Sequence, residues 1–318
     1  MTLFERFQKK DPVALSKFIT FVENQSKDYE KFLSRIYPMT GKAYRIGMTG
    51  PPGSGKSTLT DKLAQKLSSQ DRTVGIIAVD PTSPFTGGAL LGDRIRMQAL
   101  SSVKDVFIRS MASRGSKGGL AKTTKEVILV LDAFGKDYII IETVGVGQVD
   151  LDVVDNCDTT LVVFTPESGD AIQAMKAGLM EIADIFVVNK ADREGASNLI
   201  YELDSFLDLK RKKGNSFGKC WEYPVISVQA THNIGIDLLW KKIEEHKKFI
   251  QDNGIFEKKR KAQIKSEIKK LIENRIKEIT EEKVKESFDI ENIVEEVLAG
   301  KDDPYSASER FLREAKLI

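Results

Sequence analysis

The stretch IGMTGPPGSGKSTLT, residues 46–60, decides the fold of this chain. A short apolar run leads into a loop rich in glycine and proline, and a helical pattern begins at Lys56 and Ser57. Gly50, Gly55, Lys56 and Ser57 have the G-x-x-x-x-G-K-S spacing of a P-loop, which binds nucleotide phosphates. The motif requires a strand before the loop and a helix after it, and both patterns are present. The sequence therefore predicts a P-loop fold.

The residue types of this loop fit the binding of an oligophosphate. Glycine has no Cβ atom, so the backbone can wrap closely around phosphate groups and turn its N–H groups inward. The helix that follows presents its positive N-terminal end to the same groups. We expect Lys56 to reach the β- and γ-phosphates and the Ser57 hydroxyl to bind Mg²⁺. The residues expected to contact the nucleotide here are Gly50, Pro51, Pro52, Gly53, Ser54, Gly55, Lys56, Ser57 and Thr58.

The composition argues against several other classes of protein. The 318 residues include 49 basic and 47 acidic side chains, so no nucleic-acid partner is expected. No apolar run approaches the roughly 20 residues of a membrane helix, and the N-terminus MTLFERFQKK lacks the apolar core of a signal peptide. Cys157 and Cys220 lie far apart, which is typical of a reducing cytoplasm without a disulfide framework. We expect a cytoplasmic protein with no membrane partner.

The chain divides into three parts. Residues 1–42 are predicted to form an N-terminal helical segment, residues 43–252 a nucleotide-binding domain, and residues 253–318 a C-terminal helical extension. In the middle part, apolar strands alternate with helical patterns, which predicts an α/β fold with a mostly parallel, doubly wound sheet. The candidate strands are 44–49, 73–79, 105–109, 138–142, 159–165, 184–188 and 223–228.

The C-terminal extension has a different character. Residues 257–287 are dense in lysine and glutamate, and apolar residues recur there at helical spacing. A charged helix with one narrow apolar stripe usually buries that stripe against its parent domain or a second chain. The stripe consists of Ile264, Ile268, Leu271, Ile272, Ile276 and Ile279.

The nucleotide base is indicated by Asn189-Lys190-Ala191-Asp192, which follows the candidate strand 184–188. In this N-K-x-D pattern the Asp carboxylate accepts hydrogen bonds from the ring N–H and the exocyclic amine of guanine. Adenine offers no matching pair, so a carboxylate buried against adenine would lose its partners. The Lys190 stem can pack over the base. The sequence thus predicts GTP and GDP as substrate and product. Three later residues are expected to brace the base edge: Ser227, Gln229 and Ala230.

Acidic residues supply the expected metal and hydrolysis chemistry. Glu142 ends the strand YIIIE, where its carboxylate can hold Mg²⁺ through water, and the Gly145 N–H can approach the γ-phosphate. No glutamine directly follows Gly145, so a water-positioning glutamine of the Ras type is not assigned; Gln148 is more simply a polar loop residue. Asp80 and Asp93 are further candidates, with a helix cap or surface acid as the alternative. The residues expected to act in catalysis are Lys56, Asp93 and Glu142.

Several long motifs together resemble the methylmalonyl-CoA mutase-associated GTPases, the MeaB/ArgK type of SIMIBI-class P-loop GTPase. The resemblance covers most of residues 40–250 and, more weakly, both termini. It departs at Ser110-Met111-Ala112-Ser113, where many relatives are rich in proline, and at Lys117, where a leucine is common. The matching segments are GMTGPPGSGKST, AVDPTSPFTGGALLGDRIRM, IRSMASRGSKGGLA, ETVGVGQVD, GDAIQAMKAGLMEIAD, NKAD and DPYSASERFL.

The resemblance implies a particular cellular role. GTP hydrolysis would operate a G-protein chaperone that times the loading or protection of adenosylcobalamin in an acyl-CoA mutase such as methylmalonyl-CoA mutase. It also implies a homodimer built with residues 253–318. The implied Mg²⁺ site consists of Ser57, Asp80, Asp93 and Glu142. The implied switch loops are 80–97, 142–155 and 167–178, the last containing Gln173 and Lys176.

Other functions remain open at this stage. A metallochaperone GTPase needs metal ligands, but the two histidines, His232 and His246, are isolated and neither cysteine has a near partner. A signal-recognition GTPase needs a methionine-rich tail, yet the last methionine is Met180. A kinase-like regulator of a basic amino-acid transport protein would need an acceptor-binding module, which is not evident. A binding protein without turnover is the non-enzyme alternative.

Overall fold

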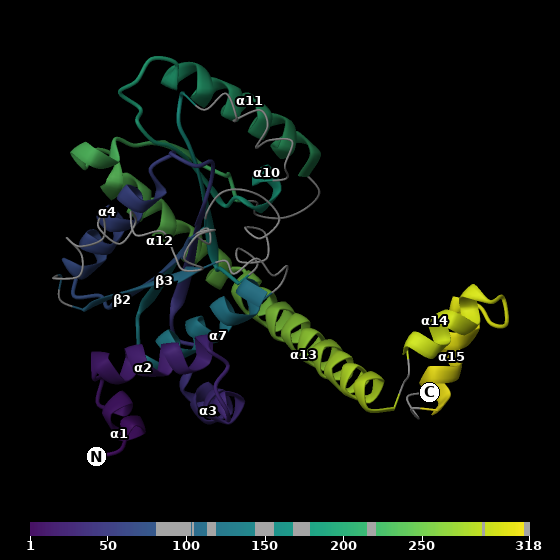
Figure 1. Ribbon diagram of the computed structural model, residues 1–318. Coiled ribbons are helices and arrows are strands. Elements are labelled where there is room, and N and C mark those ends of the chain that lie inside the picture. The colour runs from purple at the N-terminus through teal and green to yellow at the C-terminus, as the bar shows by residue number, and fades with distance from the viewer. Residues whose placement is uncertain are drawn as a thin grey trace. The chain divides into compact units, whose positions relative to one another are not determined.

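Seven strands hydrogen-bond side by side in the order β3-β2-β4-β1-β5-β6-β7 (Figure 1). The computed structural model describes residues 1–80, 103, 105–112, 119–143, 156–167, 179–214, 221–287 and 290–314. Each pairing between these strands is parallel. The strands are β1 Tyr44–Thr49, β2 Val74–Asp80, β3 Val106–Ala112, β4 Tyr138–Glu142, β5 Thr159–Phe164, β6 Ile185–Val188 and β7 Val225–Ser227. The predicted α/β class and parallel sheet are confirmed.

Helices cover both faces of this sheet, because alternate residues of the buried strands point to opposite sides. In β4, Tyr138 and Ile140 belong to the core under α4 and α12, whereas Ile139 and Ile141 belong to the core under α7. A third apolar cluster joins β5 and β6 to α10 and α11. These helices are α4 Lys56–Ser68, α7 Gly119–Phe134, α10 Leu179–Ile182, α11 Ala196–Gly214 and α12 Ile236–Asp252.

The N-terminal helices pack against α7 within the same compact unit as the sheet, residues 1–256. Aromatic rings join these helices: Phe18 of α2 stacks on Phe32 of α3 with ring centroids 4.1 Å apart, and Phe7 of α1 meets Phe134 of α7 edge-on at 5.3 Å. Arg109 of β3 also pairs with Glu23. The helices before the sheet are α1 Leu3–Gln8, α2 Pro12–Glu23, α3 Tyr29–Ile36 and the 3₁₀ turn η1 Tyr37–Met39.

A buried carboxylate on α7 holds the segment that enters β1. Asp132 is fully buried, and its oxygens accept backbone N–H bonds from Gly41, Lys42 and Ala43 at 2.8, 3.1 and 3.0 Å. Arg45, at 3.6 Å, adds a positive charge. Because a buried carboxylate is tolerated only when it is paired, this cluster ties the N-terminal helices, β1 and α7 together.

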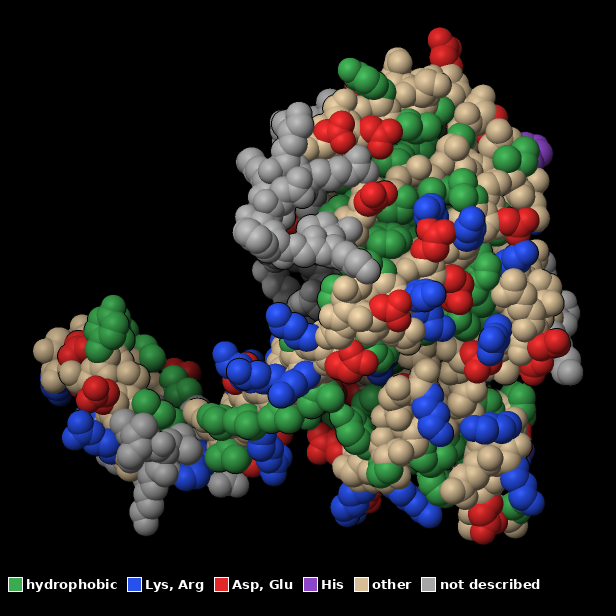
Figure 2. Space-filling model, turned by 180° about the vertical axis from the view of Figure 1, so that it is seen from behind, with side chains coloured by type: hydrophobic (Ala, Val, Ile, Leu, Met, Phe, Trp, Pro, Cys, Tyr) green, Lys and Arg blue, Asp and Glu red, His purple; other side chains and the backbone are tan. Residues whose placement is uncertain are grey.

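Residues 257–318 form a second compact unit, to which nearly all of α13 Ile255–Ser287 belongs. The helix is charged except for an apolar stripe, visible as the run of hydrophobic side chains along α13 in Figure 2. Exposed fractions along the stripe lie between 44% and 57% for Ile264, Ile268, Leu271, Ile272 and Ile276.

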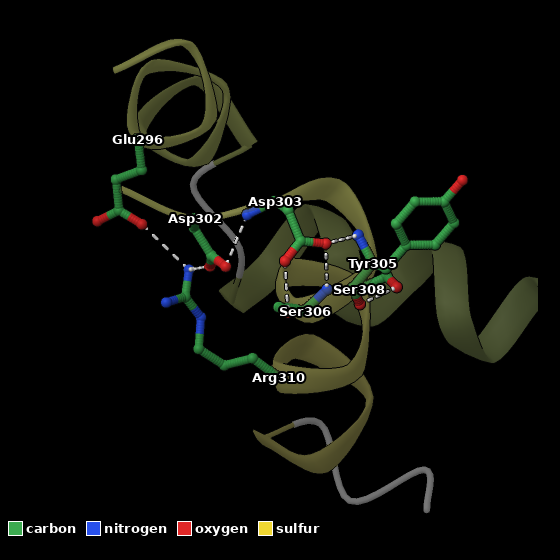
Figure 3. A network of polar contacts seen from close by, with 7 residues as sticks. All are labelled: Glu296, Asp302, Asp303, Tyr305, Ser306, Ser308 and Arg310. Atoms are coloured by element: carbon green, nitrogen blue, oxygen red, sulfur yellow. Dashed lines mark hydrogen bonds and ion pairs between the residues drawn. The ribbon is translucent and has the colours of Figure 1, made fainter. Parts of the chain in front are cut away.

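The rest of this unit is a helical hairpin of α14 Ile290–Leu298 and α15 Pro304–Glu314 (Figure 3). Asp303 begins α15: its carboxylate accepts the N–H groups of Tyr305 and Ser306 at 2.9 and 3.1 Å, as an N-cap does. Arg310 of α15 pairs with Glu296 of α14 at 3.1 Å.

Throughout the described parts of both units, no helix combines the length and apolarity needed to span a bilayer.

The Asp132 cluster gives a test of the fold. Asp132→Ala should lower the free energy of unfolding by about 2–4 kcal/mol, because three buried N–H donors lose their acceptor. Urea unfolding measures this, with Asp204→Ala, at an exposed position of α11, as the control. A loss below about 1 kcal/mol would mean that solvent or a neighbouring group replaces the carboxylate.

Candidate functional site

The P-loop connects β1 to α4, and two of its glycines are required by close backbone approaches. Gly50 has φ +139°, and a Cβ there would lie 2.1 Å from the Val163 carbonyl oxygen of β5. Gly55 has φ +86°, and a Cβ there would lie 2.3 Å from Nδ2 of Asn189. Any larger residue would therefore push the loop away from the sheet or displace Asn189.

Lys56 begins α4 and folds back over this loop. Its Nζ donates hydrogen bonds to the carbonyl oxygens of Gly50 and Pro51, at 2.8 and 3.0 Å, and the residue is buried. The ammonium group is thus held inside the curve of the P-loop. A buried cation in this place attracts an anionic ligand.

The next residues of α4 face the end of β4. The Ser57 Oγ donates to Glu142 Oε1 at 2.5 Å, and Thr60 Oγ1 donates to the other carboxylate oxygen at 3.1 Å. Residues three apart on a helix share a face, so both hydroxyls reach the same carboxylate. Glu142 is 7% exposed. A hydroxyl and a carboxylate in contact are hard oxygen donors of the kind that Mg²⁺ takes.

Asp61, one position further along, lies close to the same group. Burial and then the nearby Glu142 charge raise the pKa of the Asp61 carboxyl to about 6. Its Oδ1 atom is buried and has no hydrogen-bond partner in the part of the chain that the structure describes. Two carboxylates therefore converge where α4 meets the end of β4.

Asn189 joins the P-loop to the loops after β6 and β7. Its Nδ2 donates to the Ser54 carbonyl oxygen at 2.9 Å, and its Oδ1 accepts the Ala230 N–H at 3.2 Å. Asn189 is buried, so both hydrogen bonds are protected from water. The segment after β7 closes as a short bridge in which the Gln229 N–H donates to the Ile234 carbonyl oxygen at 3.0 Å.

The residues after Asn189 present a carboxylate to solvent. Lys190 adopts a left-handed conformation with φ +55°, and the Ala191 N–H donates to the Val228 carbonyl oxygen at 3.1 Å. This turn leaves Asp192 exposed. Glu167, in the loop after β5, pairs with both Lys190 and Arg193.

The structure thus brings together most of the residues that the sequence singled out. The P-loop, Glu142, Asn189 and Ala230 make direct contacts, and Ser227 and Gln229 lie on the same loop as Ala230. Asp80 ends β2 two residues beyond Ala78, the register partner of Glu142, so its backbone lies at the same sheet edge. The described residues do not include Asp93, Gly145, Gln148, Gln173, Lys176, or the Asp80 side chain.

Sequence reasoning missed Thr60, Asp61 and Glu167. The i+3 and i+4 spacing from Ser57 could have placed Thr60 and Asp61 near the side of α4 that faces Glu142. No local pattern marks Glu167, because its partners lie more than 20 residues further along the chain.

The loop fits a nucleotide phosphate chain and the donor set fits Mg²⁺. The Ser54 Oγ atom is buried inside the P-loop and has no hydrogen-bond partner among the described residues. Gly53 has φ +75°, and no atom of the described residues lies within 4 Å of the position a Cβ would take. An unpaired hydroxyl and an open backbone turn beside the Lys56 ammonium suit an anionic ligand.

This fold and site define a P-loop GTPase. The family model described as Methylmalonyl Co-A mutase-associated GTPase MeaB matches residues 15–285, and the chain belongs to that family. Its activity is the hydrolysis of GTP to GDP and phosphate.

Individual proteins show the extent of the similarity. A Pyrococcus abyssi protein named as a GTPase is 51% identical over 312 residues, covering 98% of this chain and 95% of that protein. The Mus musculus protein named Methylmalonic aciduria type A homolog, mitochondrial, is 34% identical over 276 residues, covering 86% of this chain and 66% of its own. The crystal structure of an LAO/AO transport system kinase covers 99% of this chain and 95% of its own at 26% identity, with a TM-score of 0.71.

The exposed Asp192 carboxylate yields a test of base recognition. Asp192→Asn should weaken GDP binding by about 100-fold or more, because the amide presents a donor to a guanine donor. Xanthine has a carbonyl where guanine has its amine, so XDP should bind the variant better than GDP. Calorimetry with both nucleotides measures this, with Glu194→Gln, an exposed neighbour, as the control. Unchanged GDP affinity would remove Asp192 from the site.

Proposed function

We propose that this GTPase is a G-protein chaperone for an adenosylcobalamin-dependent acyl-CoA mutase. The observation that carries the proposal is the match of residues 15–285 to a family described as mutase-associated. The similarity to the mouse methylmalonic aciduria type A homolog supports the same role. In this role GTP binding and hydrolysis time the loading or protection of the mutase cofactor.

The residues of the site divide the work of hydrolysis. The P-loop N–H groups and Lys56 hold the phosphates, and Lys56 must leave its two carbonyl partners to stabilise charge on the transferred phosphoryl group. Asp192 reads the guanine, and the Asn189 contacts keep the base loop against the P-loop. Asp93 is the proposed hydrolytic residue of the segment 80–97, and the Gly145 N–H is proposed to bind the γ-phosphate.

Mg²⁺ is the proposed cofactor, held by Ser57 and Glu142 together with Asp80 and Asp93. When bound, the ion neutralises charge that develops on the phosphate oxygens. The direct contact between Ser57 and Glu142 supports this assignment, since it places two hard oxygen donors beside the P-loop.

The second candidate function is a kinase-like regulator of a basic amino-acid transport protein, favoured by the similarity to the LAO/AO transport system kinase. The two candidate functions differ in the acceptor of the γ-phosphate. With γ-labelled GTP, the chaperone reading predicts free labelled phosphate, whereas the kinase reading predicts label on an acceptor protein.

The mutase partner can be tested through the proposed switch segment 167–178. We expect the host's cobalamin-dependent mutase to raise the GTP turnover rate of the wild-type protein. Gln173→Ala and Lys176→Ala should weaken that stimulation about 10-fold while leaving GDP affinity unchanged, because a switch contact acts on coupling. Phosphate release with and without the mutase measures this. The chaperone proposal would be overturned if the mutase did not raise the GTP turnover rate and bound equally well to the GTP-bound and GDP-bound protein.

A homodimer built on residues 253–318 is also proposed. Its support is the apolar stripe of α13, whose isoleucines and leucine lie about half exposed in a single chain. A second copy of the helix could cover this stripe as in other paired amphipathic helices.

Charge placed in the stripe tests the dimer. We expect the wild type to be a dimer at micromolar concentration and the double variant Ile268→Asp, Ile272→Asp to be a monomer. A charge in the apolar stripe of α13 would be buried without a partner between the two helices. Light scattering measures the mass, and Asn274→Asp, exposed on another side of α13, is the control. A wild-type protein that is already monomeric would contradict the proposal.

A further inference from the structure

Asp61 lies three residues beyond the P-loop segment GMTGPPGSGKST and occupies the helix face that carries the site. Ser57, Thr60 and Asp61 are separated by three and four positions on α4, so they share the side of the helix that meets the end of β4. Ser57 and Thr60 both donate to Glu142 from this side. Asp61 continues the same row but can donate nothing when it is ionised.

The environment of Asp61 leaves one of its oxygens without a donor. Oδ1 is buried and unpaired within the described part of the chain, and Lys62, the adjacent cation, makes no hydrogen bond to it there. Elsewhere on α4 a charge finds a partner, as Lys66 does with Asp237 at 2.6 Å. An unpaired buried carboxylate oxygen beside a second carboxylate is unfavourable, so this arrangement is built for a positive or donating ligand.

We infer that Asp61 is a positioning residue for the proposed Mg²⁺ ion, and that its buried Oδ1 accepts a hydrogen bond from a water molecule of the hydrated ion. The inference rests on the proposed Mg²⁺ site of Ser57 and Glu142. Mg²⁺ loses its waters reluctantly and keeps several of them in protein sites. Those waters are hydrogen-bond donors, and carboxylates that accept from them orient the ion without touching it.

The buried Oδ1 atom supports this role over that of a solvated helix acid, because a solvated carboxylate would find water donors for both of its oxygens. The pKa of the Asp61 carboxyl is raised, by burial first and by the nearby Glu142 charge second, which agrees with a place for a cation or a hydrogen-bond donor.

The test compares GDP affinity in saturating Mg²⁺ and in EDTA, by calorimetry, for wild type, Asp61→Asn and Asp61→Ala. The ratio of the two affinities is the gain due to the ion. We expect Asp61→Asn to reduce this gain about 10-fold and Asp61→Ala somewhat more, while the affinity in EDTA stays at the wild-type value. The nucleotide-free Asp61→Asn protein should melt roughly 2–4 °C higher at pH 7.5, because a partly buried negative charge, and with it the repulsion from Glu142, is removed.

Asp204→Asn, which removes an exposed carboxylate of α11, is the matched control and should alter neither quantity. If Mg²⁺ increases the GDP affinity of both Asp61 variants as much as that of the wild type, the inference is overturned whatever the melting temperature. Asp61 would then only destabilise the nucleotide-free protein. An equal loss with and without Mg²⁺ would also overturn it, since Asp61 would then act through α4. If the GDP affinity of the wild type is the same with and without Mg²⁺, the proposed metal site on which the inference rests is wrong, whereas guanine binding is unaffected.

Discussion

The side-chain amide of Asn189 holds three loops of the site in one arrangement. It donates to the P-loop at Ser54 and accepts from the loop after β7 at Ala230, while its own backbone continues β6. The Gly55 position leaves no room for a Cβ because the same amide occupies that space. A glycine of the phosphate motif and an asparagine of the base motif are thus parts of one contact, although 134 positions separate them in the chain (189 − 55).

The opposite side of the P-loop is held by β4. The Glu142 carboxylate accepts hydrogen bonds from the hydroxyl groups of Ser57 and Thr60. These bonds anchor the N-terminal part of α4 to β4, the strand next to β1. Since Asn189 after β6 holds the P-loop at Ser54 and Glu142 of β4 holds α4 at Ser57, the rigid sheet positions the residues that are proposed to bind the phosphates, the base and the metal. The N-terminal helices add to this frame, because Asp132 ties the entry of β1 to α7.

Much of this architecture is predictable from local pattern, since apolar strands and a P-loop carry strong signals. The strand ends differ from the prediction. Asp105 and Tyr223 have positive φ, which an extended strand does not allow, so β3 and β7 begin after them. β3 also continues past Arg109, whose side chain pairs with Glu23. Asp132 was beyond prediction, because it looks like an ordinary polar helix residue until the tertiary structure shows which face of α7 is buried. Thr60 and Asp61 were missed although their spacing from Ser57 places them near its side of α4.

The coupling through Asn189 is tested most directly with a ligand that has no base. The affinity of the protein for Mg²⁺-pyrophosphate can be measured by calorimetry for wild type, Asn189→Ala and Asp192→Ala. If Asn189 holds the P-loop, Asn189→Ala should weaken pyrophosphate binding about 10-fold, because the Ser54 carbonyl loses its donor, whereas Asp192→Ala should leave it unchanged. Wild-type pyrophosphate affinity in Asn189→Ala would contradict the account and would show that the phosphate loop keeps its shape without the base loop.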